Sequence, residues 1–176
     1  MLNSLLVLAG AVVGLAGGVF ATIYAQNRQS KREKYKELRS NLLVVTLEVS
    51  KVLAWAEKHA TYCASCSAEQ FMSASQNPPA QVDPNPAQKI QAIASLYFPE
   101  IVDDARALSI AGSQHHIIAH QLFLARFQLH LGKGSQKDVV KEQENVHAAF
   151  VNLCARQERF ENATQKLMAK LLKEKS

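Results

Sequence analysis

The sequence predicts an all-α protein, in which a single N-terminal transmembrane helix continues into an antiparallel three-helix bundle, coiled-coil-like, with a Pro-kinked second helix. Three observations predict this fold. Residues 1–27 carry no charged side chain. Apolar residues in the rest of the chain recur every three or four positions, which is the helical period. No stretch alternates apolar and polar residues as a half-buried strand does, and 176 residues suit one ordinary domain after the anchor.

The first expected element is a transmembrane anchor at residues 1–27. Leu5 to Ala25 is a run of 21 residues without charge, and a helix of that length rises about 30 Å, the thickness of the hydrocarbon core of a bilayer. A cleaved signal peptide, the main alternative, has basic residues before a shorter apolar stretch, and the first four residues contain none. We therefore expect an uncleaved, single-pass anchor.

Basic residues directly after the anchor predict its orientation. Cationic flanks of a membrane helix stay on the cytoplasmic side during insertion. The predicted location is therefore the plasma (inner) membrane, with the C-terminal domain in the cytoplasm. The same cations are expected to contact lipid headgroups, so membrane lipids are a predicted partner. The basic residues that follow the anchor are Arg28, Lys31, Arg32, Lys34, Lys36 and Arg39.

Glycines inside the anchor predict self-association. Gly10, Gly14 and Gly18 recur every four residues and so lie along one face of a helix. A groove of small residues lets the backbones of two membrane helices approach closely. The stripe therefore predicts a homo-oligomer, although glycine is also common in membrane helices for other reasons.

The bundle domain, residues 28–176, is expected to contain three helices. Four of the chain's five prolines fall within residues 73–87, which we interpret as a loop because proline ends helices. The helices have similar lengths, so they are expected to pack antiparallel, with the turn at Gly132 near the membrane. Their expected ranges are about residues 28–72, 86–131 and 136–174.

Start and stop signals support these ranges. Asn85 precedes the second helix, and Ser135 with Asp138 precedes the third, as N-terminal capping residues do. Gly132 follows the second helix at the position where glycine commonly ends one. Pro99 lies inside the second helix, where we expect a kink or a short break.

Three residues of the first helix raise the possibility of a metal or redox site. His59, Cys63 and Cys66 are spaced i, i+4 and i+7, so they share one helix face. The first and last are about 10 Å apart along the axis, however, whereas zinc bonds to these ligands measure about 2.0–2.3 Å. Thiols on the apolar seam of a helix usually behave as small buried hydrophobic groups, and we favour that interpretation.

The second helix contains four histidines, of which His116 and His120 share a face. Two histidines at i and i+4 can chelate a metal, but no nearby carboxylate completes the hydrolase pattern HExxH. We expect histidines of the core or of an interface. The sequence also lacks the nucleophile elbow, the P-loop and the dinucleotide fingerprint, so neither a cofactor nor an enzymatic activity is predicted.

The net charge of +5 is concentrated near the expected membrane surface. Residues 26–66 contain eight basic and four acidic residues, a net charge of +4. Nucleic-acid binding would favour Lys or Arg aligned along one helix with aromatic residues between them, and that pattern is missing. The charge therefore fits lipid headgroups, and no nucleic-acid partner is expected.

These observations favour a membrane-anchored adaptor or assembly protein that self-associates through the glycine stripe and presents a cytoplasmic bundle to a protein partner. The sequence does not identify that partner. One alternative is a metal or redox sensor that uses His59, Cys63 and Cys66. Another is an outward-facing rod that bridges the layers of a cell envelope, as phage lysis subunits do.

Overall fold

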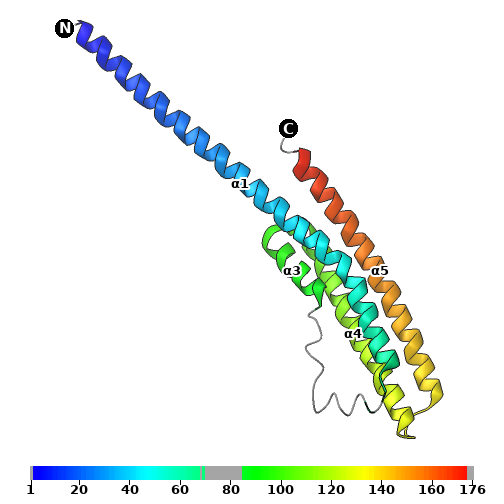
Figure 1. Ribbon diagram of the computed structural model, residues 1–176. Helices are drawn as coiled ribbons and strands as arrows, with labels where there is room; N and C mark the ends of the chain where they lie inside the picture. Colours follow the sequence, from blue (N-terminus) through cyan, green and yellow to red (C-terminus); the bar gives the residue numbers. More distant parts are fainter. Residues whose placement is uncertain (1, 68, 70–84, 174–176) are drawn as a thin grey trace. The chain divides into compact units, whose positions relative to one another are not determined.

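The computed structural model describes residues 2–67, 69 and 85–173, and side chains from Tyr24 onward in that set. Every regular element in these residues is helical, which confirms the predicted all-α class (Figure 1). The elements are α1 (Leu2–Ser65), α3 (Pro86–Tyr97), the short 3-10 helix η1 (Pro99–Ile101), α4 (Val102–His130) and α5 (Gln136–Lys173).

The chain divides into two compact units, Met1–Ser40 and Asn41–Ser176, and α1 contributes to both. In the first unit, five of the six expected headgroup cations are exposed and Arg39 is half-buried. The glycine stripe at Gly10, Gly14 and Gly18 lies outside the residues whose side chains and surroundings are described. In the part of the chain that was described, no helix combines the length and the apolar character needed to cross a membrane.

The second unit is built around α4, which contacts α3 and α5 and also packs against the second half of α1. The apolar residues that recur every three or four positions along this half of α1 form a seam, which is buried here. Its residues are Leu42, Val45, Val49, Val52, Ala56, Cys63 and Cys66, each 7% exposed or less. Leu153, Phe160, Leu167 and Leu171 form the matching seam of α5. The helical bundle is therefore confirmed for residues 41–67 and 85–173.

The helix directions differ from the expected antiparallel arrangement. The ring of His59 stacks on that of His116, and one turn later the carbonyl oxygen of Cys63 accepts a hydrogen bond from Arg126. Residue numbers thus rise together along both helices, so α1 and α4 run in the same direction. In contrast α5 is antiparallel to α4, because Arg159 forms an ion pair with Asp104 in the first turn of α4.

The chain reversal at Pro99 explains this difference. Proline lacks the N–H that would continue α3, and Phe98 before it adopts an extended backbone (φ −136°, ψ 71°). The buried side chains of Phe98 and Ile101, each 2% exposed, fix the reversal in the core. As a result α3 folds back along α4 (Figure 1). At Pro99 the chain therefore reverses its direction, where only a kink or a short break was expected. The turn at Gly132 lies at the end of the bundle where α1 ends.

The capping signals are confirmed. Asn85 Oδ1 accepts a hydrogen bond of 3.0 Å from the backbone N–H of Ala87 at the start of α3. Ser135 and Asp138 form reciprocal side chain to backbone hydrogen bonds at the start of α5. Gly132, with φ 69°, follows α4 in the left-handed conformation that glycine adopts at low cost. α1 ends at Ser65, and the expected end near residue 72 lies outside the described residues.

We predict that Gly112→Ala destabilises the protein although Ala is the better helix former by about 1 kcal/mol. A Cβ atom at Gly112 would lie 2.9 Å from Asn85 Nδ2, and the Asn85 side chain is held in place because it caps α3. The expected loss in the free energy of unfolding is about 1–3 kcal/mol, measured by thermal or chemical denaturation in detergent.

Ser113→Ala, one position along α4, is the control, since it favours the helix without a new contact at Asn85. The cost of Gly112→Ala should also shrink in an Asn85→Ala background, because the obstructing amide is gone. An increase in stability from Gly112→Ala alone would contradict the close approach of α3 and α4.

Candidate functional site

The candidate site is a cluster of aromatic and thiol side chains between α1 and α4, which we call the ring cluster. It consists of Trp55, His59 and Cys63 on α1 and His116 on α4. The ring centroids of His59 and His116 are 3.8 Å apart with an interplanar angle of 17°. The Trp55 ring stacks on His116 at 5.6 Å. His59 Nε2 lies 3.6 Å from Cys63 Sγ, within hydrogen-bonding range of sulfur.

Burial keeps the ionisable members of the ring cluster neutral. It lowers the pKa of His59 to about 4, and the neighbouring His116 lowers it further because two imidazolium charges repel. Burial and the nearby Cys66 raise the pKa of Cys63 to about 11. At neutral pH the site therefore contains imidazoles and a thiol. Since the thiolate is the reactive form of cysteine, the raised pKa makes Cys63 a weak nucleophile at neutral pH.

The residues proposed as metal ligands are brought near one another but do not converge. The rings of His59 and His116 stack face to face in nearly parallel planes, so their nitrogens do not point toward a common position. Cys66 Sγ donates to the carbonyl oxygen of Ser67 at 3.6 Å, and the His120 ring stacks on Phe123 at 5.8 Å. Among residues 24–67, 69 and 85–173, no group of three His, Cys, Asp or Glu side chains is arranged to hold an ion.

His115 lies on another face of α4, toward α5. Its side chain is fully buried and its ring contacts Phe150 at a centroid distance of 5.8 Å. Neither ring nitrogen has a hydrogen-bond partner among the described residues, and burial lowers the pKa of the imidazole. A neutral, packed ring at this position contributes to the core.

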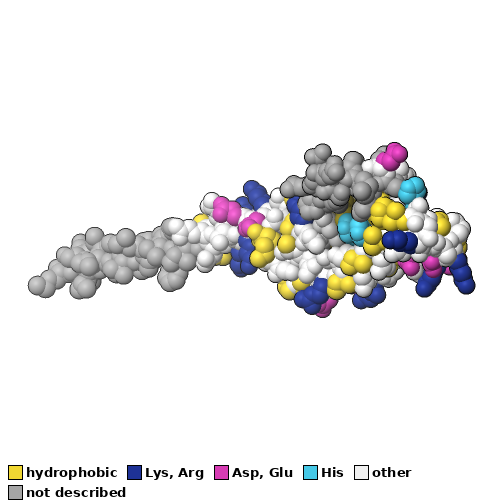
Figure 2. All heavy atoms as spheres, turned by 90° about the horizontal axis from the view of Figure 1, so that it is seen from below, with side chains coloured by type: hydrophobic (Ala, Val, Ile, Leu, Met, Phe, Trp, Pro, Cys, Tyr) yellow, Lys and Arg dark blue, Asp and Glu magenta, His cyan; other side chains and the backbone are white. Residues whose placement is uncertain are grey.

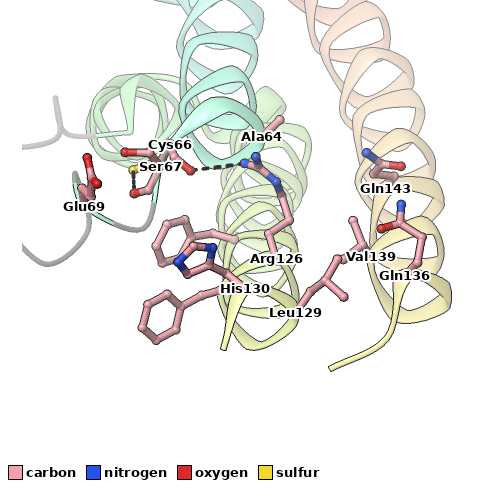
Figure 3. Close-up of a pocket in the computed structure, with 12 residues that line it drawn as sticks. Ala64, Cys66, Ser67, Glu69, Arg126, Leu129, His130, Gln136, Val139 and Gln143 are labelled. Carbon is pink, nitrogen blue, oxygen red and sulfur yellow. Dashed lines mark hydrogen bonds between the residues drawn. The ribbon is translucent and has the colours of Figure 1, made fainter. Parts of the chain in front are cut away.

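Arg126 is a site residue that the sequence analysis missed. Its Nη1 donates to the carbonyl oxygens of Cys63 and Cys66, at 3.1 and 3.5 Å, and so satisfies acceptors at and just beyond the end of α1. Figure 3 shows the bond to Cys66. A cation at a helix C-terminus also interacts favourably with the helix dipole. The signal was present in the sequence, because Arg126 is the lone Lys, Arg, Asp or Glu between residues 107 and 132.

A cleft of about 780 Å³ opens beside Arg126, between the end of α1, the end of α4 and the start of α5. Its wall combines the aromatic rings of Phe123 and Phe127 with polar side chains from all three segments, among them His130 and Gln143 (Figure 3). Because the Arg126 guanidinium is already engaged with α1 carbonyl oxygens, its first role is to hold α1 against α4. The arrangement stabilises the bundle and offers a surface of mixed polar and aromatic character.

Comparison with known proteins supplies no family for this chain: no family, curated protein or solved structure matches it.

The first prediction for the ring cluster concerns acid. The folded-state pKa of His59, about 4, lies below the ordinary value of 6.5, so the unfolded chain binds this proton more readily. The contribution is fully present above pH 6.5 and is lost as the pH falls toward 4. We expect the free energy of unfolding to decrease by about 1–2 kcal/mol from this group, a figure reduced for its partial contact with solvent.

His59→Phe keeps an aromatic ring in the stack and removes the proton site, so the variant should lose less stability between pH 6.5 and 4 than the original chain does. Denaturation in detergent, followed by circular dichroism at several pH values, measures the difference. Identical pH profiles for the two proteins would show that His59 is not buried as described.

The second prediction concerns the thiols. If Cys63 and Cys66 are packing groups, replacing both by Ala should cost about 1–2 kcal/mol of stability and leave the helical content unchanged. Elemental analysis of the purified original chain should find no stoichiometric zinc. Cys154→Ala, at a half-buried position on α5, is the control. Bound zinc that disappears in the double variant, but not in the control, would establish the metal-sensor hypothesis.

Proposed function

We propose that the chain is a single-pass, membrane-anchored adaptor whose helical second unit binds a protein partner. The observation that carries the proposal is the 21-residue uncharged run from Leu5 to Ala25, which is followed within three residues by the first of six cations. Charged side chains at the centre of a membrane helix cost about 2.5–3.5 kcal/mol each, so their exclusion over the length of a bilayer favours a membrane segment.

The cations after this segment support a cytoplasmic second unit. Arg28, Lys31 and Arg32 are exposed, and so are Lys34 and Lys36, which leaves them accessible to anionic headgroups. Each cation near such a surface contributes about 1 kcal/mol, and the same excess keeps this flank on the cytoplasmic side during insertion. The proposed location is therefore the inner membrane, with the second unit in the cytoplasm.

The surface of the second unit supports the proposed binding role. Large apolar side chains interrupt its polar surface, and the face in Figure 2 shows several of them beside histidines and cations. Neighbouring exposed apolar side chains are typical of protein interaction sites, and Leu43 and Leu47 lie one turn apart on α1. The most exposed are Leu96 (77%), Leu47 (63%), Leu43 (56%), Ile117 (56%), Val151 (54%) and Leu172 (54%). In the ring cluster His59 and His116 are half-buried and Cys63 is buried, and all three favour their neutral forms, so packing explains them better than catalysis does.

Self-association is part of the proposal. Gly10, Gly14 and Gly18 repeat at the spacing that allows two membrane helices to pack closely. An oligomeric anchor would present several copies of the second unit to one partner. Such multivalent presentation raises the affinity for a partner without any new contact.

A matched pair of variants tests the anchor. Leu8→Arg with Val12→Arg places two charges inside the uncharged run and should release the protein from carbonate-washed membranes. Leu8→Ile with Val12→Ile keeps the segment apolar, and that variant should remain in the membrane fraction. If the original chain appears in the soluble fraction, the anchor does not exist.

A reporter fused after Ser176 tests the orientation in the same preparations. We expect it to be active only in the cytoplasm, because the cationic flank is retained there. A reporter that is accessible from the outer side would instead support the envelope-bridging rod.

A further inference from the structure

The outward face of α4 carries a regular apolar stripe, which we call the outer seam. Its apolar members are Ile110, Ile117, Leu124 and Leu131, which are 51%, 56%, 41% and 50% exposed. Gln114, Gln121 and Gln128 alternate with them and are also exposed. The spacing runs four, three, four, three over three heptads, the repeat with which one helix packs along another.

The outer seam is distinct from the contacts that hold the second unit together. α4 packs on α1 through Ala119 and Phe123, on α5 through Leu122 and Ala125, and on α3 next to Gly112. These residues lie on the other sides of the helix. α4 thus carries large apolar side chains on its outer face as well, whereas a helix with one face in water normally has a polar outer face.

The chemistry of the outer seam favours an identical partner. Between Arg106 and Lys133 the seam contains no charged residue. Charges along a helical seam normally select a different partner or repel a copy, and neither effect operates here. Each glutamine amide has both donors and acceptors, so it can pair with the same residue of a second copy. The branched isoleucine and leucine side chains of the outer seam can likewise pack against the same residues of a second copy.

We propose that α4 pairs with α4 of a second copy, parallel and in register, along the outer seam. The parallel direction rests on the proposed membrane anchor. Because α1 and α4 run in the same direction, parallel α4 helices place Asn41 of both copies at the same end of the pair. That is what two anchors in one membrane require. Ile117 then faces Ile117 of the partner, and Gln114 faces Gln114.

This contact is expected to depend on confinement in the membrane. Glutamine at alternate seam positions specifies register but lowers the stability of the pair compared with an all-apolar seam. Two copies held in one bilayer have a high effective concentration, which compensates for a weak contact. The outer seam would thus add a second, cytoplasmic contact to the one proposed between the glycine stripes.

Disulfide crosslinking in native membranes tests the contact. In a chain whose three cysteines are replaced by Ala, Gln114→Cys should form a covalent dimer under mild oxidation. Val151→Cys, at a position on α5 that is also exposed, is the control and should crosslink at least tenfold more slowly. Equal rates at the two positions, or no dimer from Gln114→Cys, would overturn the proposal. A dimer that forms only when Gln114→Cys and Gln128→Cys chains are mixed would show antiparallel pairing and overturn it as well.

Charged substitutions at Ile117 test whether the outer seam is the surface that brings the two copies together. Adding Ile117→Glu to Gln114→Cys should lower the crosslinking rate at least tenfold, and so should Ile117→Lys, because like charges then face each other. Mixing the Ile117→Glu chain with the Ile117→Lys chain should restore the crosslinking rate, because opposite charges then face each other. Failure to restore the rate would mean that the partner is not a second copy. Membrane fractionation reports on the anchor separately, so a failed anchor and a failed seam give different results.

Discussion

The chain reversal at Pro99 is the constraint on which the rest of the second unit depends. Without it, residues 86–130 would form one helix that returns along α1, and the end of α4 would lie far from the end of α1. Phe98 and Ile101, both buried, hold the reversal in the core, and α3 packs back on α4. The same reversal allows Arg126 to reach the last carbonyl oxygens of α1 and the ring of His116 to meet that of His59.

Because α1 and α4 run in the same direction, their interface brings together histidines and cysteines. These residue types are common in reactive sites, but here they are held in their neutral forms. Burial favours the neutral forms of His59 and Cys63, and Arg126 is engaged with backbone oxygens. The interface is therefore best understood as packing that is sensitive to acid. Exposed apolar residues elsewhere on α1, α3 and α4 support the proposal of an adaptor at a membrane.

Much of the local structure could be predicted from the sequence, because caps and periodicity are local signals. Asn85, Ser135 and Gly132 mark helix ends where the structure has them, and the seam of α1 is buried as expected. The direction of α4 could not be predicted in this way. A proline within a helical pattern is compatible with a kink or with a reversal, and the choice depends on tertiary contacts of Phe98 and Ile101. The role of Arg126 depends on that direction, so it was missed too.

The most direct test of this account is the direction of α1 relative to α4. Spin labels on cysteines introduced at Thr61 and His130, or at Ser50 and His130, in a chain whose native cysteines are replaced by Ala, give two distances by pulsed electron paramagnetic resonance. Dilution with unlabelled protein keeps both within one molecule. Parallel helices predict that the distance from Thr61 is shorter, by about 10–15 Å, than the distance from Ser50. A shorter distance from Ser50 would mean that α4 returns along α1 and would contradict the account.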